Sequence, residues 1–427
     1  MGGYLAYTEY KESGIEWLGK VPAHWQLKKL QHIARLRSGE TMTAQMMNEN
    51  DEFPVYGGNG LRGYFNFYTH DGNYVLIGRQ GALCGNINYG SGKFWASEHA
   101  VVVSPTIELE TFWLGELLRT MNLNQYSTSA AQPGISVEQI ARLKIPFPPV
   151  EEQRSIARFL NYKTAQIDAL ITKKETLLKK LAEKRTALIS QAVTKGCDRT
   201  VPLKDSGIEW LGEIPAHWET SRLKFVSKII DCKNRTPEYF DNGGYLVVRT
   251  SNVRGGKLIL TGAYYTDEEN FKEWTKRGIP PVGSVLFTRE APAGEVCLVP
   301  ENTKLCMGQR MMNFTLNNGW MNRFILYFLS SQYFFDFISA QSSGSTVTHL
   351  RVEQVYSIDV VVPPKEEAIA ICQFIECEDK KILKSMSQVS LAIQTLKEYR
   401  TALITNAVTG KIDVRDVMLE LEPVEAA

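Results

Sequence analysis

The sequence contains no long apolar segment. A helix needs roughly 20 consecutive apolar residues to span a membrane. The most apolar stretch, residues 324–338, is interrupted by Ser330, Ser331, Gln332 and Asp336. The first residues, MGGYLAYTEYKE, also lack a basic region followed by an apolar core, so no signal peptide is predicted. We therefore expect a cytoplasmic protein that does not enter a membrane.

Spacings typical of metal, disulfide and nucleotide sites are missing as well. The seven cysteines are scattered without a CxxC pair, and the six histidines stand apart without an HExxH spacing. No GxSxG turn and no phosphate-binding GxxxxGK(S/T) loop occurs. We expect buried thiols, no catalytic residue, no metal and no cofactor in this chain.

An excess of positive charge is also absent. The 48 Lys and Arg residues nearly balance 47 Asp and Glu residues, which leaves a formal net charge of +1. A protein that neutralises many phosphates unaided usually carries a clear basic excess. Any role in nucleic-acid binding therefore requires local patches or a partner that shares the contacts.

What the sequence does contain is an internal duplication. Residues 12–25, ESGIEWLGKVPAHW, return at 205–218 as DSGIEWLGEIPAHW with 11 of 14 positions identical. A second pair is PPVEEQRSIARFL at 148–160 and PPKEEAIAICQFI at 363–375. The segments KRTALISQAVTKG and YRTALITNAVTGK then end the two halves. The halves diverge between these segments, which indicates a common scaffold that carries two different specificities.

The duplication predicts the domain boundaries. A chain of 427 residues is too long for one hydrophobic core, because single cores stop growing near about 250–300 residues. We predict a first variable domain at 1–147, a long helix at 148–197, a second variable domain at 198–362, a second long helix at 363–412 and an acidic tail at 413–427. Short β-branched and aromatic runs separated by glycine and asparagine predict strands and tight turns in both variable domains.

Both long helices show a sustained apolar pattern. Each follows a proline pair and two glutamates, a typical helix start. Steps of three and four residues predict a coiled-coil seam of about five heptads. In the first helix these steps select Ile156, Leu160, Lys163, Ile167, Leu170, Lys174, Leu177, Leu181, Lys184, Leu188 and Gln191. Two unrelated amphipathic helices, each packed on its own domain, are the alternative.

Chain connectivity restricts how the helices pair. A helix of roughly 45 residues is about 65 Å long, longer than a domain of about 150 residues is wide. The second domain is joined closely to the end of one helix and the start of the other, which favours antiparallel pairing. We predict an α+β fold in which two domains are joined by two antiparallel helices in a pseudo-twofold dumbbell.

Two different domains on a rod suggest recognition of an asymmetric, split DNA site. Polar residues near glycine-rich turns are the candidates for base contacts. In the first domain these are Asn59, Arg62, Arg79, Gln80 and His99; in the second they are Arg249, Asn252, Arg254, Arg289, Gln309 and Arg310. Arg79 aligns with Arg289, and Glu98-His99 aligns with Gln309-Arg310. Alternatively, these arginines pair with acids such as Glu98 or Glu290 to hold the fold.

The duplicated segments carry tryptophans at equivalent places. Trp17, Trp25, Trp210 and Trp218 are candidates for docking two copies of a partner, although burial against the rod explains them equally well. His24 and His217, in the repeated PAHW, are predicted to be hydrogen-bonded scaffold residues.

The SGIEWLGxxPxHW segments, the PPxxEQ-like segments and the RTALIxxAVTxG helix ends resemble the specificity subunits of type I restriction-modification systems. The resemblance covers nearly the whole chain. It implies double-stranded DNA as ligand, and two modification subunits that methylate adenine with S-adenosylmethionine as partners. It also implies a motor-nuclease restriction subunit that uses ATP and Mg²⁺. The chain departs from the pattern at Ala368-Ile369, where the first copy has Gln153-Arg154.

That resemblance implies a subunit that selects the site and performs no chemistry. The sequence has no (Asp/Asn)-Pro-Pro-(Tyr/Phe) methylation motif. Two alternatives belong to other classes. A solitary nuclease or methyltransferase would modify DNA by itself when incubated with S-adenosylmethionine, and an adaptor for protein or sugar would not be displaced by DNA.

Overall fold

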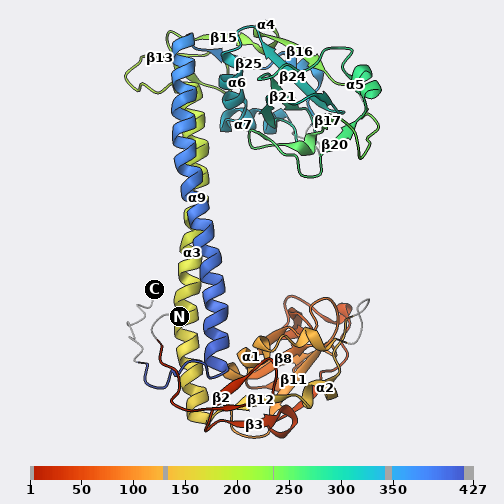
Figure 1. Ribbon diagram of the computed structural model, residues 1–427, viewed down its shortest axis with the longest axis vertical. Coiled ribbons are helices and arrows are strands. Elements are labelled where there is room, and N and C mark those ends of the chain that lie inside the picture. The colour runs from red at the N-terminus through yellow and green to blue at the C-terminus, as the bar shows by residue number, and fades with distance from the viewer. Residues whose placement is uncertain (1–3, 128–132, 234, 342–348, 418–427) are drawn as a thin grey trace. The chain divides into compact units, whose positions relative to one another are not determined.

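The computed structural model describes residues 4–127, 133–233, 235–341 and 349–417. The chain forms two compact units. Unit 1 contains residues 1–174 and 391–427, and unit 2 contains residues 175–390. Each unit therefore includes about half of each long helix, α3 and α9 (Figure 1).

Unit 1 is built on two four-stranded sheets. The first has the order β4 (Ala34–Ser38), β11 (Ala100–Pro105), β8 (Tyr74–Gly78), β9 (Ile87–Gly90), with antiparallel neighbours. The second has the order β6 (Gly60–Phe65), β5 (Phe53–Gly57), β10 (Lys93–Ala96), β7 (His70–Asp71), and β10 runs parallel to β5. Two ribbons pair β1 (Tyr10–Glu12) with β2 (Lys20–Pro22) and β3 (Gln26–Lys29) with β12 (Lys144–Phe147). The short helices are α1 (Thr111–Thr120), α2 (Val137–Ala141), η1 (Leu30–His32), η2 (Ala44–Met46) and η3 (Leu123–Tyr126).

Unit 2 repeats this topology. Its antiparallel sheet has the order β16 (Ser227–Asp231), β24 (Met311–Leu316), β21 (Val285–Thr288), β22 (Val296–Leu298). A three-stranded sheet has the order β20 (Tyr264–Thr266), β17 (Tyr245–Val248), β23 (Leu305–Met307), again with one parallel pair. Three ribbons pair β13 (Leu203–Asp205) with β14 (Glu213–Pro215), β15 (Glu219–Arg222) with β25 (Asp359–Val362), and β18 (Val253–Arg254) with β19 (Lys257–Leu258). The short helices are α4 (Leu223–Val226), α5 (Glu268–Trp274), α6 (Met321–Leu329), α7 (Gln332–Gln341), α8 (Val352–Tyr356) and η4 (Thr250–Asn252).

The central strands of the antiparallel sheets are buried on both faces. In unit 1, Val101, Val102 and Val103 of β11 are each 1% exposed. In unit 2, Phe287 of β21 and Phe314 of β24 are fully buried. Continuous β-branched and aromatic runs suit such strands because every side chain packs against a neighbour. The predicted α+β fold with two repeated domains is confirmed.

The long helices α3 (Val150–Lys195) and α9 (Lys365–Val408) run antiparallel. Within unit 1, Arg400 near the end of α9 binds Asp168 in the first half of α3, with an Nε–Oδ1 distance of 2.9 Å. Within unit 2, Arg185 in the second half of α3 binds Asp379 near the start of α9. As the position along α3 increases, the position along α9 decreases. The predicted antiparallel pairing is confirmed.

The predicted heptad seam matches the buried face of α9 along most of its length, but it departs from the buried face of α3. Four buried isoleucines on α9, at 371, 382, 393 and 404, follow a step of 11 residues, and Ile156, Ile167 and Ile189 on α3 fit the same step. Ile375 on α9 and Ile171 on α3 are buried as well and lie outside this series. The predicted seam residues Leu170 and Leu177 are each 43% exposed. An 11-residue repeat gives about 3.67 residues per turn, close to a straight α-helix, whereas a strict heptad drifts by about 20° per repeat. On α3, counting in heptads therefore departs from the buried face after Ile167.

The duplicated PAHW segments hold the ends of the long helices. In unit 1, Glu152 in the first turn of α3 accepts from Trp25 Nε1 at 2.9 Å, pairs with His24 Nε2 at 2.8 Å and accepts from the hydroxyl of Tyr7. A Cβ atom on Gly410, just after α9 and at φ +72°, would lie 3.0 Å from the Trp25 ring. One tryptophan thus contacts the start of α3 and the end of α9.

Unit 2 repeats this corner. Glu367 in the first turn of α9 pairs with His217 Nε2 at 2.7 Å and accepts from Trp218 Nε1 at 3.0 Å. Gly196, just after α3, lies against the Trp218 ring. The prediction that His24 and His217 are hydrogen-bonded scaffold residues is confirmed.

Two further expectations concern the ends of elements. Helices α3 and α9 lie inside the predicted ranges 148–197 and 363–412. Of the predicted acidic tail 413–427, residues 418–427 lie outside the described residues. None of the described helices has the length and apolar character required to cross a membrane.

Candidate nucleic-acid interface

Three turns of unit 1 surround a depression of about 520 Å³. They are the β5–β6 turn, the loop after β8 and the turn before β11. The lining residues are Gly58, Asn59, Gly60, Leu61, Arg62, Gln80, Gly81, Ala82, Leu83 and His99. Four residues predicted to contact bases, Asn59, Arg62, Gln80 and His99, therefore come together although they are up to 40 residues apart.

Glycine permits the close approach of these turns. A Cβ atom on Gly78, the last residue of β8, would lie 2.1 Å from the carbonyl oxygen of Gly58. Backbone atoms occupy that space, so no larger residue fits without displacing a turn. The glycine-rich composition that suggested a site in the sequence thus has a structural cause.

The polar side chains of this depression are largely available. Asn59 Oδ1 accepts from Asn86 Nδ2 at 3.0 Å, and His99 Nε2 lies 3.1 Å from Glu98 Oε1. Across the described part of unit 1, Arg62 and Gln80 show no side-chain hydrogen bond or ion pair, and both are exposed. Side chains of this kind present donors and acceptors to base edges.

Arg79 lies beside the depression but outside its lining. Its Nη1 atom donates to Ser38 Oγ at 3.1 Å. Two exposed leucines at the depression, Leu61 at 54% and Leu83 at 52%, were not predicted to be site residues. Only the fold reveals that they lie next to the polar candidates.

Unit 2 has the same backbone framework at its corresponding turns. In unit 1, Arg79 N donates to His99 O at 2.8 Å and Ile135 N donates to Arg79 O at 3.0 Å. In unit 2, Arg289 N donates to Arg310 O at 2.9 Å and Leu350 N donates to Arg289 O at 3.0 Å. The alignment of Arg79 with Arg289 and of His99 with Arg310 is therefore confirmed by the backbone.

Two predicted base contacts in unit 2 are buried scaffold residues. Arg289 is only 6% exposed, and its Nη2 atom lies 3.6 Å from Asp231 Oδ1. Asn252 is 1% exposed; its Nδ2 atom donates to Ile259 O, and its Oδ1 atom accepts from Arg249 N, both at 3.0 Å. Their burial corrects the prediction, because neither side chain can reach a base in this conformation.

The remaining predicted residues of unit 2 are at least partly exposed, and they differ in the contacts that hold them. The Arg249 guanidinium lies 3.5 Å from the centre of the Tyr264 ring, and its Nη2 atom donates to Gly262 O at 2.8 Å. Arg254 lies 3.8 Å from Glu295. Gln309 is exposed, and its backbone N–H lies 3.4 Å from Thr236 Oγ1.

Arg310 pairs with Glu290, one of the acids expected to bind these arginines if they hold the fold. Its Nε atom lies 2.9 Å from Glu290 Oε2 in an ion pair. The same oxygen lies 3.0 Å from Nδ1 of His349, a residue not predicted to belong to the site. The pairing of an aligned arginine with Glu290 is therefore confirmed for Arg310, whose side chain is nonetheless 44% exposed.

The four tryptophans divide into two classes. Trp25 and Trp218 are fully buried, so they serve the scaffold and offer no surface to a partner. Trp17 and Trp210 are partly exposed, and Trp210 packs against Phe337 with 5.0 Å between ring centres. Partner docking remains a prediction for Trp17 and Trp210 alone.

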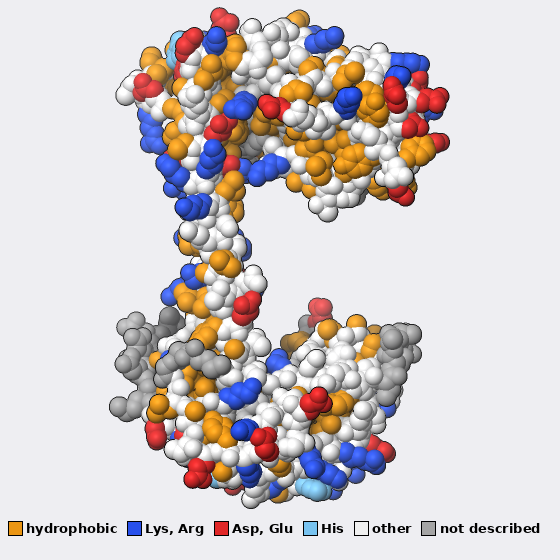
Figure 2. Space-filling view, in the orientation of Figure 1, with side chains coloured by type: hydrophobic (Ala, Val, Ile, Leu, Met, Phe, Trp, Pro, Cys, Tyr) orange, Lys and Arg blue, Asp and Glu red, His pale blue; other side chains and the backbone are white. Residues whose placement is uncertain are grey.

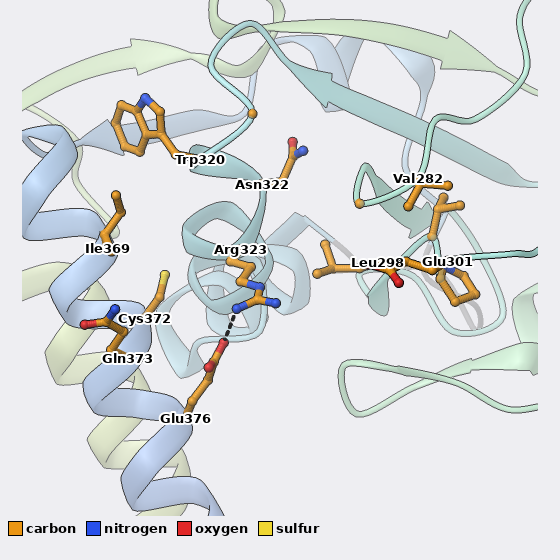
Figure 3. Close-up of a pocket in the computed structure, with 14 residues that line it drawn as sticks. Val282, Leu298, Glu301, Trp320, Asn322, Arg323, Ile369, Cys372, Gln373 and Glu376 are labelled. Atoms are coloured by element: carbon orange, nitrogen blue, oxygen red, sulfur yellow. Dashed lines mark hydrogen bonds and ion pairs between the residues drawn. The ribbon is translucent and has the colours of Figure 1, made fainter.

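The departure at Ala368-Ile369 changes the surface at the start of α9. In unit 1, the buried Gln153 accepts from Glu110 N at 3.0 Å and donates to Pro148 O at 2.9 Å. In unit 2, Ala368 stands in place of Gln153 and is fully buried, and Ile369, in place of Arg154, lines a pocket of about 610 Å³ between α9 and α6. Figure 3 shows the Arg323–Glu376 ion pair, at 2.9 Å, between α6 and α9 in that pocket.

Charged side chains are mixed on the visible surface. Figure 2 shows Lys and Arg interspersed with Asp and Glu on both units, with the densest group of cations over the part of the long helices in unit 2. Seven exposed lysines belong to that part: Lys179, Lys180, Lys184, Lys365, Lys380, Lys381 and Lys384. Within the described residues, no group of three or more His, Cys, Asp or Glu side chains could hold a metal ion.

Comparison with known proteins identifies the family. A model described as the type I restriction modification DNA specificity domain matches residues 22–180 and 215–406, more than half of the chain. The chain therefore belongs to this family.

Curated relatives are specificity subunits. The Methanocaldococcus jannaschii type I restriction enzyme MjaVIII specificity subunit is 23% identical over 428 residues, which cover 96% of this chain and 98% of the relative. The Escherichia coli EcoprrI specificity subunit is 44% identical over 138 residues. That match spans about a third of each protein, 31% of this chain and 34% of the relative.

Solved structures share the fold. A chain from a structural study of complex assembly and conformational transition in the type I R-M system is 15% identical, with a TM-score of 0.64 over 92% of this chain and 99% of that chain. The HsdS subunit from Thermoanaerobacter tengcongensis is also 15% identical, with a TM-score of 0.54 over 94% of this chain and all of that subunit.

Proposed function

We propose that the chain is the DNA-recognition subunit of a type I restriction-modification complex and that it reads an asymmetric bipartite site. The turns of unit 1 read one half-site, and the corresponding turns of unit 2 read the other. Helices α3 and α9 determine the length of the unread gap. The chain itself performs no chemistry.

The observation that carries this proposal is one backbone framework with two sets of side chains. Matching hydrogen bonds place Arg79 and His99 in unit 1 where unit 2 has Arg289 and Arg310. The neighbouring positions also differ, with the exposed Gln80 in one unit and the partly buried Glu290 in the other. Phosphate contacts carry no sequence information, so different exposed side chains on one framework favour readout of different bases.

The partners follow from the family. Two methyltransferase subunits and the restriction subunits dock on this chain, with Trp17 and Trp210 among the docking residues. S-adenosylmethionine and ATP with Mg²⁺ are bound by those partners. The complex acts on double-stranded DNA in the cytoplasm.

The test is a methylation profile of the chain in complex with its methyltransferase subunit over duplexes with randomised sequence. A bipartite motif is the expected result. Single alanine variants of Gln80 and His99 should change one half-site, and those of Gln309 and Arg310 the other. Adenine methylation by the chain alone would instead indicate an enzyme, and a profile without sequence preference would refute the proposal.

A further inference from the structure

We propose that Arg310 reads a guanine in the half-site of unit 2 and that Glu290 and His349 are its positioning residues. This inference rests on the proposed function and specifies its chemistry at one base. Among the predicted arginines of unit 2, it assigns base readout to Arg310 in particular, since the others make different contacts.

The first argument is the way in which Arg310 is bound. The shortest contact between Glu290 and the Arg310 guanidinium, 2.9 Å, is made by Nε. Neither Nη1 nor Nη2 of Arg310 has a hydrogen-bond partner among residues 4–127, 133–233, 235–341 and 349–417. The guanidinium plane is thus oriented while its two terminal nitrogens remain free. Guanine presents two acceptors, O6 and N7, in the major groove, and this fork matches them.

A second argument is the shielding of the acid. The Glu290 side chain is 19% exposed, whereas those of Arg310 and His349 are 44% and 49% exposed. Glu290 is therefore less accessible than the two side chains that it contacts, and it is the least available of the three for a hydrogen bond to a base. Its role is to fix the direction of Arg310, since an oriented arginine loses less side-chain entropy when it binds.

Backbone conformation supplies a third argument. Arg310 has φ +69°. This left-handed conformation is strained for a residue other than glycine, and such outliers concentrate at functional sites. Glycine would adopt it without that strain, so the position retains a side chain at the expense of stability.

Unit 1 lacks this device at the corresponding place. Isolated bridges pair Glu290 with His349 in unit 2 and Gln80 with Gly134 in unit 1. His99 stands where unit 2 has Arg310. Without a charged fork and its carboxylate, unit 1 cannot read guanine in this manner, and we expect a different base at its equivalent position.

A base analogue tests the contact without altering the protein. The motif of the unmodified complex with its methyltransferase subunit is first determined from a randomised library. Each guanine of the site is then replaced by 7-deazaguanine, which lacks the N7 acceptor. Replacement of one guanine in a single half-site should lower methylation by about 5-fold, the lower end of the range for a complete bidentate contact, because O6 remains as an acceptor.

Protein variants then test whether Arg310 is the residue that contacts that guanine. With Arg310→Ala, preference for it should disappear, 7-deazaguanine should have no further effect there, and all other positions should stay as before. Arg310→Lys keeps the charge but should also lose the preference, because an ammonium group has no planar fork. Glu290→Ala should weaken the preference while Arg310 is retained. Arg323→Ala, an exposed and acid-paired arginine on α6, is the matched control and should leave the motif unchanged.

Three results would overturn the inference. One is a uniform loss of methylation with an unchanged motif in Arg310→Ala, which marks a phosphate contact. Another is a site in which no guanine depends on N7. The third is a complex without any sequence preference, which refutes the proposed function itself. If Arg310→Ala does not fold, the analogue series on the unmodified chain and Arg310→Lys still decide the question.

Discussion

Trp25 Nε1 donates to Glu152 Oε1 at 2.9 Å across 127 residues of sequence. This bond joins the first duplicated segment to the second, because Trp25 ends PAHW and Glu152 follows the proline pair. Trp218 and Glu367 form the same bond in unit 2, at 3.0 Å. The PAHW segment and the proline–glutamate segment therefore contact each other and form one structural corner. Each unit contains one such corner.

The two corners differ in burial, which predicts unequal stability effects. The Glu152 side chain is 5% exposed, whereas that of Glu367 is 27% exposed. Trp25→Phe leaves a buried carboxylate short of one donor, which costs about 1–3 kcal/mol, while water can replace the donor in Trp218→Phe, for about 0.5–1.5 kcal/mol. We expect Trp25→Phe to lower the calorimetric unfolding temperature more. Equal decreases in unfolding temperature for the two variants would show that the lost tryptophan packing, and not the lost hydrogen bond, determines the effect.

Thiol reactivity should separate the cysteines by burial. Burial raises the pKa of Cys297, Cys306 and Cys372 to about 12. The thiolate is the nucleophile, so these residues should react only after unfolding. Cys197 and Cys377 are exposed. At about pH 8, where a normal thiol is partly ionised, a chromogenic disulfide should therefore label these two in the native protein.

The two exposed thiols should also differ from each other. Partial burial, and then the charge of Glu367, raise the pKa of Cys197, so its reactive fraction at a given pH falls. Glu367→Gln removes the second cause and should accelerate labelling of Cys197 but not of Cys377. Mass spectrometry of timed samples provides the measurement. Rapid native labelling of Cys297 would contradict the buried placement.

Local signals predicted the scaffold well and the site only in part. The repeats, the proline–glutamate helix starts and the helix connectivity predicted two domains with antiparallel helices, because each depends on short-range chemistry. The buried Arg289 lies near Asp231, which is 58 residues away in the sequence. His349 contacts Glu290 across 59 residues of sequence. Residue type alone could not distinguish the buried Arg289 from the exposed Arg310.

The 11-residue repeat predicts which changes in helix length are tolerated. Deletion of 171–181 with 383–393 removes one repeat from each helix and keeps the buried isoleucines in step. The Arg185–Asp379 and Arg400–Asp168 ion pairs lie outside the deleted segments. Four-residue deletions after Leu170 and after Ser385 are out of step with the repeat. We expect both changes to alter the gap between half-sites and to preserve the half-sites, and only the four-residue change to lower thermal stability.

Methylation profiling and calorimetry of the two deletion variants measure these effects. Eleven residues correspond to about 16 Å of helix. The unmodified complex is the reference for both readouts. A changed half-site with an unchanged gap would show that the helices do not set the spacing, and equal stability losses would contradict the 11-residue repeat.

Binding by the isolated chain should be weak and dominated by phosphate contacts. The formal net charge is +1, and cations and acids are interspersed on the face shown in Figure 2. Non-specific DNA binding falls steeply with salt, by about 0.9 logarithmic units per phosphate contact for each tenfold rise in salt. Without shared contacts, we expect micromolar or weaker binding at physiological salt, with little difference between cognate and scrambled duplexes.

The methyltransferase subunit should raise both the affinity for DNA and the preference for the cognate duplex, because it adds DNA contacts that the chain lacks. Anisotropy titrations at two or more salt concentrations, with and without that subunit, measure affinity and salt slope together. The complex should discriminate the cognate duplex, and Arg310→Ala should reduce this discrimination without restoring the salt slope of the isolated chain. Nanomolar, sequence-specific binding by the chain alone would refute the argument that partners share the DNA contacts.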